Sequence, residues 1–475
     1  MFRGIFVKFK HPAYRILLLV IIGFSAIIIV KWSLTQEFNT VENNGSLSDD
    51  LKKGTVNYFA ENGFGKPLST LQHPAGEYYQ GVTYMSYQGS HEDPYVCSYN
   101  HRTKEWVGPI QAGTSALGNF ITPTDPDVID NHGRPAMIVD NQGYIHIFFG
   151  GHGGHFFLGS NPLGFIGSGK QTHVVSKNPG DISSWEILDN ISPFGTYSQL
   201  MKMSNGNIYL FYRHGSHRSD WVYQKSTDNG RTFDSPVSII KHKKQSGNSS
   251  VYDAWYAWFQ EGPVDTVVVA FNYHPCANPD HSSLRVNSYA MKMNTADDSW
   301  ENAKGEKLNM PLTKESADLS ALIFDSEGKG TRLGTSGADT EGIIYAYFRH
   351  SSKEPFLLYH RWNGKAWQTS KIKESGYKFN DGDFVLEGKE KIQFLFSLRN
   401  GSLEEIGWWD SNDNGINWKK ENSFFSSAHS KFVMSALIRN AHPDARVIVG
   451  EIPDNPIGLY SKLYLYGEAG SITRN

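Results

Sequence analysis

Apolar and polar positions alternate in a repeating order from about residue 54 onward. In one unit, the apolar stretches 135–139 and 144–149 flank the polar turn Asp140-Asn-Gln-Gly143. A further strand then ends in a polar turn and an aromatic residue. Two apolar stretches joined by a turn of this kind predict an antiparallel hairpin. The chain beyond residue 54 is therefore expected to consist of short antiparallel strands.

Two of the turns that end a third strand follow the Asp-box pattern S-x-D-x-G-x-x-[FW]. They run from Ser226 to Phe233 and from Ser411 to Trp418. In this pattern the Asp caps backbone amides, the Gly adopts a positive φ, and the aromatic residue packs between neighbouring sheets. Looser copies of the turn end at Trp106, Trp185, Trp300 and Trp367. A recurrence of about 40–50 residues with several strands per unit is typical of a β-propeller.

Counting the hairpins gives seven units, so the sequence predicts an all-β fold, a seven-bladed β-propeller. A strand at residues 56–59 is expected to complete the last blade and close the ring. Six or eight blades, or two stacked β-sandwiches, are the alternatives. The units span residues 55–110, 130–190, 195–240, 250–305, 316–370, 378–422 and 430–468.

Residues 1–34 form a separate N-terminal segment. The uncharged apolar run 16–30 follows four basic residues, Arg3, Lys8, Lys10 and Arg15. This run is shorter than the ~20 residues of an ordinary membrane span, and no small-residue cleavage site follows it. The basic flank favours a cytoplasmic N-terminus. We expect an uncleaved transmembrane signal-anchor helix, with a cleaved signal peptide as the alternative, and in both cases an exported chain.

Residues 35–54 are polar and aperiodic, and we interpret them as a tether to a propeller domain at 55–475. The net charge is −3 with acids and bases interspersed, so the sequence shows no basic face for nucleic acid. The two cysteines, Cys97 and Cys276, form no disulfide framework. We expect the protein to be a monomer whose propeller lies outside the cytoplasm, in the periplasm or at the cell surface. If residues 1–34 are cleaved, we expect it to be secreted.

Ionisable residues recur where the predicted hairpins begin and end. In each blade, the start of the first strand and the end of the second lie at the same edge of the disc, beside the central channel. Such residues from three successive blades are therefore expected to meet at one rim. The residues at these positions in the second, third and fourth blades are His132, His152, Tyr197, Arg213 and Tyr256.

This set of residue types suits β-elimination on a uronic acid. Arg213 can pair with a carboxylate bidentately, and a histidine can hydrogen-bond the same group. Masking that charge acidifies the C5 proton, which a Tyr or His can remove while a Tyr hydroxyl protonates the departing O4. For glucuronate, Tyr197 alone can serve as base and acid, because the C5 proton and O4 share a face. For iduronate they lie on opposite faces, which requires His132 as base.

A second cluster, His274-Pro-Cys276-Ala-Asn-Pro-Asp-His281, follows the second strand of the fourth blade. A His-x-Cys-x4-His sequence supplies three zinc-type ligands on one loop. A fourth can come from His217 or His214 in the neighbouring loop. We expect a structural Zn²⁺, with a buried free cysteine between two hydrogen-bonded histidines as the alternative. No organic cofactor is expected.

These segments resemble the BNR-repeat propeller lyases, specifically the ulvan lyases of polysaccharide lyase family 25. The resemblance extends over nearly the whole exported part. It implies a lyase acting on an anionic rhamnose–uronate polysaccharide and carrying a structural zinc. It rests most specifically on Asn131-His-Gly-Arg-Pro135, Gly150-Gly-His-Gly-Gly-His-Phe156, Gly195-Thr-Tyr-Ser198 and Tyr209-Leu-Phe-Tyr-Arg213.

The resemblance also implies roles for single residues. His132 would be the base and Tyr197 the acid, or acid and base together. Arg213 and His152 would hold the carboxylate. The binding tyrosine of the fourth blade can be Tyr256 or Tyr252, and His155 is expected to bind substrate as well. Related rhamnose–glucuronate lyases acting on arabinogalactans share a similar set, so the linkage is predicted more firmly than the polymer.

Two other functions compete with the lyase. Asp-boxes also occur in sialidases, which grip a carboxylate with three arginines. Arg213, Arg349 and Arg399 all end second strands, so such a triad is conceivable, and Arg349 and Arg399 are also candidates for binding the lyase substrate. A sialidase further needs an arginine at the first blade's rim and an aspartic acid in a flexible loop, and neither is evident. A glycan-binding propeller without catalysis is the other alternative.

Overall fold

The computed structural model describes residues 56–120, 129–247, 251–276, 285–351, 356–372, 378–387, 391–453 and 460–474. These residues form mainly β-strands, with one α-helix among them, α3 (Lys314–Ser320). The short 3-10 helices of the same ranges are η1 (Ser90–Glu92), η2 (Ala116–Phe120) and η4 (Phe156–Leu158). The all-β prediction is therefore confirmed.

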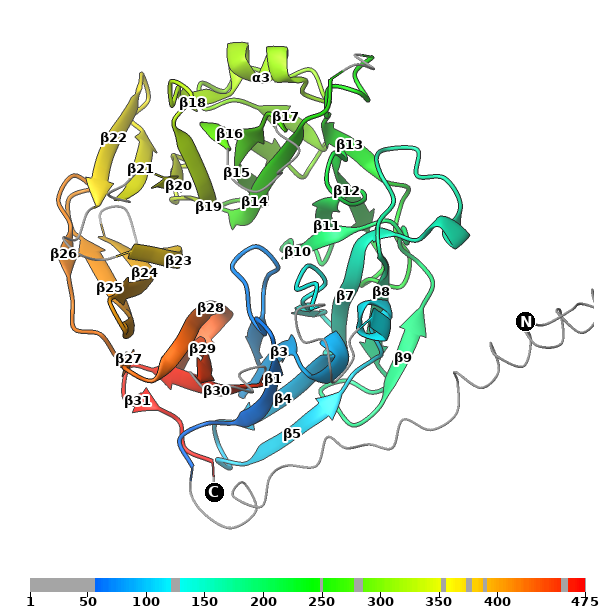
Figure 1. Cartoon of the computed structure of the whole chain (residues 1–475), viewed down its shortest axis with the longest axis vertical. Coiled ribbons are helices and arrows are strands. Elements are labelled where there is room, and N and C mark those ends of the chain that lie inside the picture. The colour runs from blue at the N-terminus through cyan, green and yellow to red at the C-terminus, as the bar shows by residue number, and fades with distance from the viewer. Residues whose placement is uncertain are drawn as a thin grey trace, which may run out of the picture. The chain divides into compact units, whose positions relative to one another are not determined.

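The strands form antiparallel groups of four that follow one another around a propeller-like ring (Figure 1). Five sheets hold one group each, and a nine-stranded sheet holds two, which gives seven groups. Group one is β2 (Gly76–Tyr79), β3 (Val82–Gln88), β4 (Pro94–Asn100) and β5 (Trp106–Gln111). Group two is β6 (Ala136–Val139), β7 (Ile145–Gly154), β8 (Gly169–Ser176) and β9 (Trp185–Leu188). Group three is β10 (Thr196–Lys202), β11 (Ile208–Arg213), β12 (Trp221–Ser226) and β13 (Val237–Ile240).

The remaining groups complete the ring. Group four is β14 (Ala254–Gly262), β15 (Thr266–His274), β16 (Val286–Asn294) and β17 (Ser299–Glu301), with β18 (Leu322–Phe324) added beside β16. Group five is β19 (Gly330–Ala338), β20 (Ile344–Ser351), β21 (Phe356–Trp362) and β22 (Trp367–Ile372). Group six is β23 (Lys378–Glu387), β24 (Lys391–Asn400), β25 (Leu403–Ser411) and β26 (Lys419–Lys420), with β27 (Phe425–Ser427) beside β25. Group seven is β28 (Ser430–His442), β29 (Ala445–Pro453), β30 (Tyr460–Gly467) and β1 (Ala60–Phe64), with β31 (Gly470–Ser471) beside β30.

The two ends of the described chain meet in group seven. Strand β1 pairs antiparallel with β30 as its fourth strand, and β2 of group one pairs in parallel with β28, through Gly76–Ile438 and Glu77–Arg439. The closing strand predicted at residues 56–59 thus lies four residues later. Residue 56 makes a single bridge to Arg474, and Phe59 is fully buried against the stacked ring of Trp106.

Both Asp-boxes form the predicted turn. In the first, the Asp228 carboxylate accepts from the Thr232 backbone N–H at 2.9 Å, and the Ser226 hydroxyl accepts from the Gly230 N–H at 2.8 Å. Gly230 has φ of 78°, which a residue with a side chain rarely adopts. The terminal Phe233 packs edge-on against Phe148 of group two at 5.8 Å. The box therefore joins neighbouring groups, as its sequence predicts.

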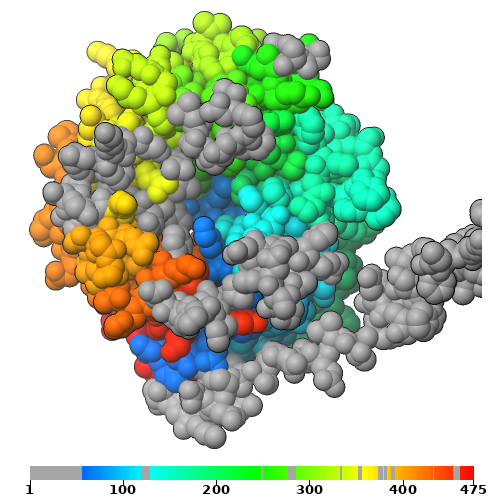
Figure 2. Space-filling view, viewed as in Figure 1, coloured from blue at the N-terminus to red at the C-terminus, as the bar shows by residue number. Residues whose placement is uncertain are grey.

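Charged side chains near the centre of the ring are paired with one another. Arg439 of β28 bonds Glu77 of β2 at 2.5 Å and Glu261 of β14 at 2.6 Å, and it donates to the Lys202 carbonyl of β10 at 3.1 Å. The network thus connects four of the groups. Figure 2 shows the face hollowed near the centre of the ring, and Arg439 also lines a cavity beside Thr70 and Asp383.

The predicted segments 1–34 and 35–54 lie outside the described residues, so the structure gives no account of them. Within the ranges described, no helix combines the length and the apolar character that crossing a membrane needs. Cys97 and Cys276 are both free thiols.

Candidate active site

The structure brings the five predicted rim residues together. His132 precedes β6, His152 lies in β7, Tyr197 lies in β10, Arg213 ends β11, and Tyr256 lies in β14. The pairing of Thr196 with Arg213 places the start of β10 beside the end of β11, as the hairpin argument requires. The His132 ring lies 3.9 Å from the His152 ring and 5.6 Å from the Tyr197 ring, centroid to centroid.

Asp130 orients both histidines. Its two carboxylate oxygens lie 2.5 Å from Nδ1 of His132 and 2.7 Å from Nδ1 of His152. An ionised carboxylate only accepts, so both histidines donate to Asp130 through Nδ1–H. Burial by itself raises the pKa of Asp130, but the hydrogen bonds from the two histidines outweigh burial and hold that pKa well below its usual range. The two Nε2 atoms are therefore the nitrogens through which these histidines can contact a ligand.

The loop that carries Asp130 is held by a second carboxylate, Glu92 of η1. Its oxygens accept from the backbone N–H groups of Asp130 at 2.6 Å and Asn131 at 3.0 Å. Glu92 has no exposed surface, and burial raises its pKa to about 7. These two hydrogen bonds hold the backbone of the residues that directly precede His132.

His132 is oriented to act as a base. Burial lowers its pKa, the Asp130 carboxylate opposes that shift, and the nearby His152 and Arg213 reinforce it. The imidazole is therefore neutral near pH 7. Its side chain remains 35% exposed, so a ligand can reach it.

Tyr197 occupies a strained backbone position. Its φ is 65°, a region that bulky residues rarely adopt, and the β10–β11 register shifts between Thr196 and Gln199. Such irregularities redirect a side chain and are common beside active sites. Burial raises the pKa of the Tyr197 hydroxyl, while the cationic Arg213 opposes the shift. The phenol is thus protonated near pH 7 and can donate a proton.

Arg213 is a buried cation with unused hydrogen-bonding capacity. Its side chain is 1% exposed, and its Cζ lies 4.8 Å from the Tyr197 ring centre and 5.5 Å from the Tyr256 ring centre. Within the described part of the chain, its Nε and Nη1 have no hydrogen-bond partner. Buried donors of this kind are rare in folded proteins and often mark a functional site. The arrangement suits neutralisation of an incoming anion.

A second arginine, Arg285, adds charge to the same pocket. Its Cζ lies 3.8 Å from the centre of the Tyr256 ring, on the side chain that Arg213 also approaches. Burial alone raises the pKa of Tyr256, but the two guanidinium groups outweigh burial and lower that pKa below its usual value. Two cations and two tyrosines therefore share one small volume.

The other predicted binding residues lie elsewhere in the ring. Tyr252 lies beside Arg218 and Lys244, whose charged groups are 4.7 Å and 5.1 Å from its ring centre. His155 caps η4 by accepting from the Phe157 N–H. Arg349 lies in β20 and Arg399 in β24, in groups five and six, and Arg399 pairs with Glu404 at 3.1 Å. None of these four residues has a described contact with the cluster around Asp130.

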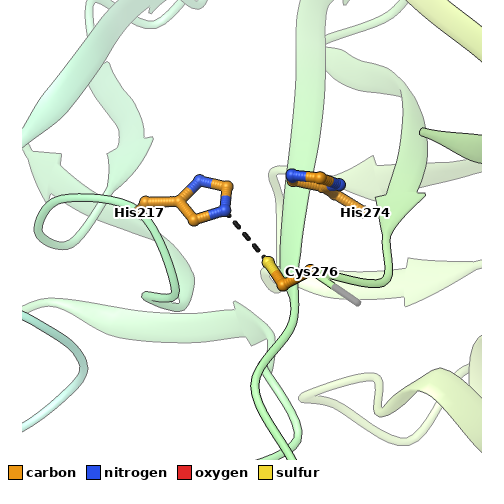
Figure 3. Close-up of side chains that lie close together, drawn as sticks. All are labelled: His217, His274 and Cys276. Atoms are coloured by element: carbon orange, nitrogen blue, oxygen red, sulfur yellow. Dashed lines mark hydrogen bonds between the residues drawn. The ribbon is translucent and has the colours of Figure 1, made fainter. Parts of the chain in front are cut away.

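Three of the predicted metal ligands also meet (Figure 3). His217, His274 and Cys276 offer ligand atoms within 4.8 Å of one another, and His217 Nε2 lies 3.0 Å from Cys276 Sγ. Burial raises the pKa of the Cys276 thiol to about 11, so a bound cation would be needed to hold it as thiolate. This donor set fits zinc. The third ligand predicted on this loop, His281, lies outside the described residues. His214, the alternative to His217 as fourth ligand, bonds Asn161 and Ser192.

Sequence reasoning missed Asp130, Glu92 and Arg285. Asp130 has a local signal, because an Asp two residues before a rim histidine can accept its Nδ1–H. Arg285 directly precedes β16, and the start of a third strand lies at the same edge as the end of the second. Glu92 has no such signal, because it acts on a loop that is distant in sequence.

Comparisons with known proteins place the chain in a family. A family model described as "BNR repeat-containing family member" matches residues 82–375. The chain is 43% identical over 462 residues to an ulvan lyase from Alteromonas sp. (strain LOR), covering 94% of this chain and 93% of that protein. It is 45% identical over 442 residues to an ulvan lyase from Nonlabens ulvanivorans, covering 90% and 92%.

Solved structures give the same result. A structure described as a PL25 ulvan lyase bound to -[GlcA(1-4)Rha3S]- superposes with a TM-score of 0.82 at 40% identity, covering 89% of this chain and 98% of that one. The polysaccharide lyase Uly1 shares the fold at a TM-score of 0.58 and 12% identity, covering 89% and 95%.

Proposed function

The chain belongs to the BNR-repeat ulvan lyases of polysaccharide lyase family 25, and we propose that it cleaves the rhamnose–uronate bond of an ulvan-type polysaccharide by β-elimination. One observation carries the proposal: a buried, carboxylate-free Arg213 lies against Tyr197, next to the Asp130-oriented histidines. Family membership makes the chain a polysaccharide lyase. The sugar sequence bound to the PL25 relative supports a glucuronate–rhamnose substrate.

The first step is neutralisation of the uronate carboxylate. Nε and Nη1 of Arg213 have no hydrogen-bond partner among the described residues, and Arg285 brings a second guanidinium to Tyr256. In a site of low dielectric, such cations stabilise a negative charge far more than they would in water. They therefore stabilise the charge that develops when the C5 proton leaves. His152 is proposed to donate to the same carboxylate through an Nε2–H, as an imidazolium that also donates to Asp130 through Nδ1–H.

The second step is proton transfer at C5 and O4. His132 is neutral with a free Nε2 and is the proposed base, while Tyr197 holds its proton and is the proposed acid for O4. For glucuronate, where both atoms lie on one face, Tyr197 is proposed to serve both steps. It first gives its phenolic proton to the neutral His132, then takes the C5 proton as a phenolate stabilised by Arg213 and passes that proton to O4. Tyr256 is proposed to position the sugar beside Arg285. No nucleophile or carboxylate pair is required.

We also propose a structural Zn²⁺ at His217, His274, Cys276 and His281. The ligand atoms of the first three lie within 4.8 Å of one another, which supports it. The loops concerned flank the rim, so the ion would brace the edge of the pocket without taking part in the reaction. Tyr252 and His155 are proposed to contact more distant sugars of the chain.

For the whole chain, we propose a closed, seven-bladed propeller that acts as a monomer outside the cytoplasm. The seven groups and the pairing of β1 with β30 support the closed ring. The apolar run at 16–30 and its basic flank support a signal-anchor in residues 1–34. The propeller would then be tethered through residues 35–54.

Digestion of defined polymers tests the proposal. Ulvan, a rhamnose–glucuronate arabinogalactan, heparan-type and pectic polymers are incubated with the chain, and ultraviolet absorbance and new reducing ends are followed together. Elimination creates a conjugated unsaturated uronate, so both signals rise together, and the largest rise is expected on ulvan. New reducing ends without absorbance would mean hydrolysis and would contradict the proposal.

A further inference from the structure

A second cluster of metal-binding side chains lies at the seam between groups one and seven. His101 follows β4 of group one, and His442 and Asp444 lie at the turn between β28 and β29 of group seven. Each offers one ligand atom within 4.8 Å of the others. His442 ends the first strand of its group, whereas Tyr197 begins the first strand of group three. The cluster is therefore at the opposite edge of the ring from the candidate active site.

The geometry suits one small divalent ion. Nδ1 of His442 lies 3.7 Å from Oδ2 of Asp444, near the distance of about 3.4 Å that separates two ligands of one tetrahedral ion. This nitrogen accepts a hydrogen bond from the Asp444 backbone N–H at 3.2 Å, which an ion bound there would replace. The His101 and His442 rings are 4.0 Å apart at 33°. Tyr78 packs against both imidazoles, at 5.5 Å and 5.4 Å.

His101 is oriented as metal-binding histidines usually are. Its Nε2 is bonded to the Thr83 hydroxyl at 2.8 Å, which fixes the ring. Its Nδ1 is buried and has no hydrogen-bond partner among the described residues. Metal-ligating histidines commonly use one nitrogen for the ion and the other for such an orienting bond.

We propose that His101, His442 and Asp444 bind a divalent transition-metal ion, of the zinc, cobalt or nickel class, that fastens group one to group seven. Two imidazoles and one carboxylate suit these ions better than Ca²⁺ or Mg²⁺, which prefer oxygen ligands. The backbone pairing at this seam is short, Gly76–Ile438 and Glu77–Arg439, and the rest of the contact is an apolar cluster that the two groups share. An ion bridging the two groups stabilises the closed ring, because the open form lacks the site.

Cobalt binding to the full-length chain tests the proposal. The protein is freed of metal by chelation and titrated with Co²⁺ in the Cys276→Ser background, in which thiolate-to-cobalt charge transfer is removed. One equivalent is expected to bind with visible ligand-field bands and to raise Tm. Adding Asp444→Asn or His442→Ala should abolish that equivalent and the Tm shift. His429→Ala, which changes an exposed histidine just before β28, is the matched control and should keep both.

The outcomes separate the two metal proposals. Retention of the bound equivalent and of its Tm shift in both Asp444→Asn and His442→Ala would overturn the seam site. A sulfur-to-cobalt charge-transfer band that is present in the wild-type chain and lost in Cys276→Ser would report on the site of His217, His274 and Cys276, because the seam site contains no sulfur. Asp444 has a 44% exposed side chain, so Asp444→Asn should fold even where His442→Ala does not.

Discussion

Two arginines, one at the centre of the ring and one at its rim, have opposite surroundings. Arg439 is bonded to the carboxylates of Glu77 and Glu261. Arg213 lies against two tyrosine rings, and two of its nitrogens have no hydrogen-bond partner in the described chain. Both side chains are largely buried. The contrast shows that the fold neutralises its central charge internally but leaves the rim charge for a ligand.

The different surroundings of Arg439 and Arg213 affect the free energy of folding differently. A buried cation paired with carboxylates stabilises a fold only as a set, because removing one member leaves the others buried and charged. A buried cation without an anionic partner has an unfavourable desolvation cost that a bound anion can offset. Arg439 should therefore matter for stability, and Arg213 for activity.

Removing the Tyr197 hydroxyl should have the largest effect at the rim. Tyr197→Phe keeps the packing against Trp221 but deletes the proton donor, so kcat on ulvan should fall by about 10²–10⁴-fold with Tm nearly unchanged. Ultraviolet absorbance measures the rate. Tyr464→Phe removes a buried hydroxyl of group seven as a control and should keep kcat. A similar kcat in wild-type and Tyr197→Phe would refute the assignment.

Arg213→Met tests the rim arginine itself. Its loss removes the cation that stabilises charge in the pocket, so kcat/KM should fall by about 10²–10³-fold. Since the charge has no carboxylate partner in the fold, the free energy of unfolding should stay the same or rise. Urea unfolding and steady-state kinetics measure the two quantities. A strongly destabilised variant would mean that Arg213 is mainly structural.

Arg439→Met should give the reverse result. It removes the guanidinium from Glu77, which has no exposed surface and keeps Lys202 at 3.5 Å, so the free energy of unfolding should fall by about 3–5 kcal/mol. The kcat of the remaining folded protein should change little. Adding Glu77→Gln should recover part of the loss, which a double-mutant cycle measures. A loss of kcat at full stability would contradict the comparison.

Asp130→Asn should slow the reaction about tenfold, less than the changes at Tyr197 and Arg213, because it disturbs the orientation of the histidines and not the reacting groups. The Asp130 carboxylate raises the pKa of His132, so removing it lowers that pKa further. The base then stays neutral to lower pH, and the acid limb of the kcat/KM profile should move to lower pH. A shift to higher pH would exclude His132 as the base.

The sequence was sufficient to predict the strands and the rim cluster, because both depend on local patterns. Alternating apolar stretches and Asp-boxes identify hairpins, and the hairpin ends place Tyr197 and Arg213 side by side. The Glu92 contact with residues 130 and 131 and the Arg439 network could not be predicted. Glu92 lies 38 residues before the loop that it contacts, and Arg439 lies 362 residues after Glu77, a pairing that forms only when the ring closes.

The most direct test of the account measures whether Arg213 recognises the carboxylate of the sugar. In the inactive Tyr197→Phe chain, calorimetry compares binding of a rhamnose–glucuronate oligosaccharide with its carboxyl-reduced, neutral counterpart. The account predicts that the acidic sugar binds at least about tenfold more tightly, and that Arg213→Met removes most of this preference. Equal affinities for the two sugars, or a preference that persists in Arg213→Met, would contradict it.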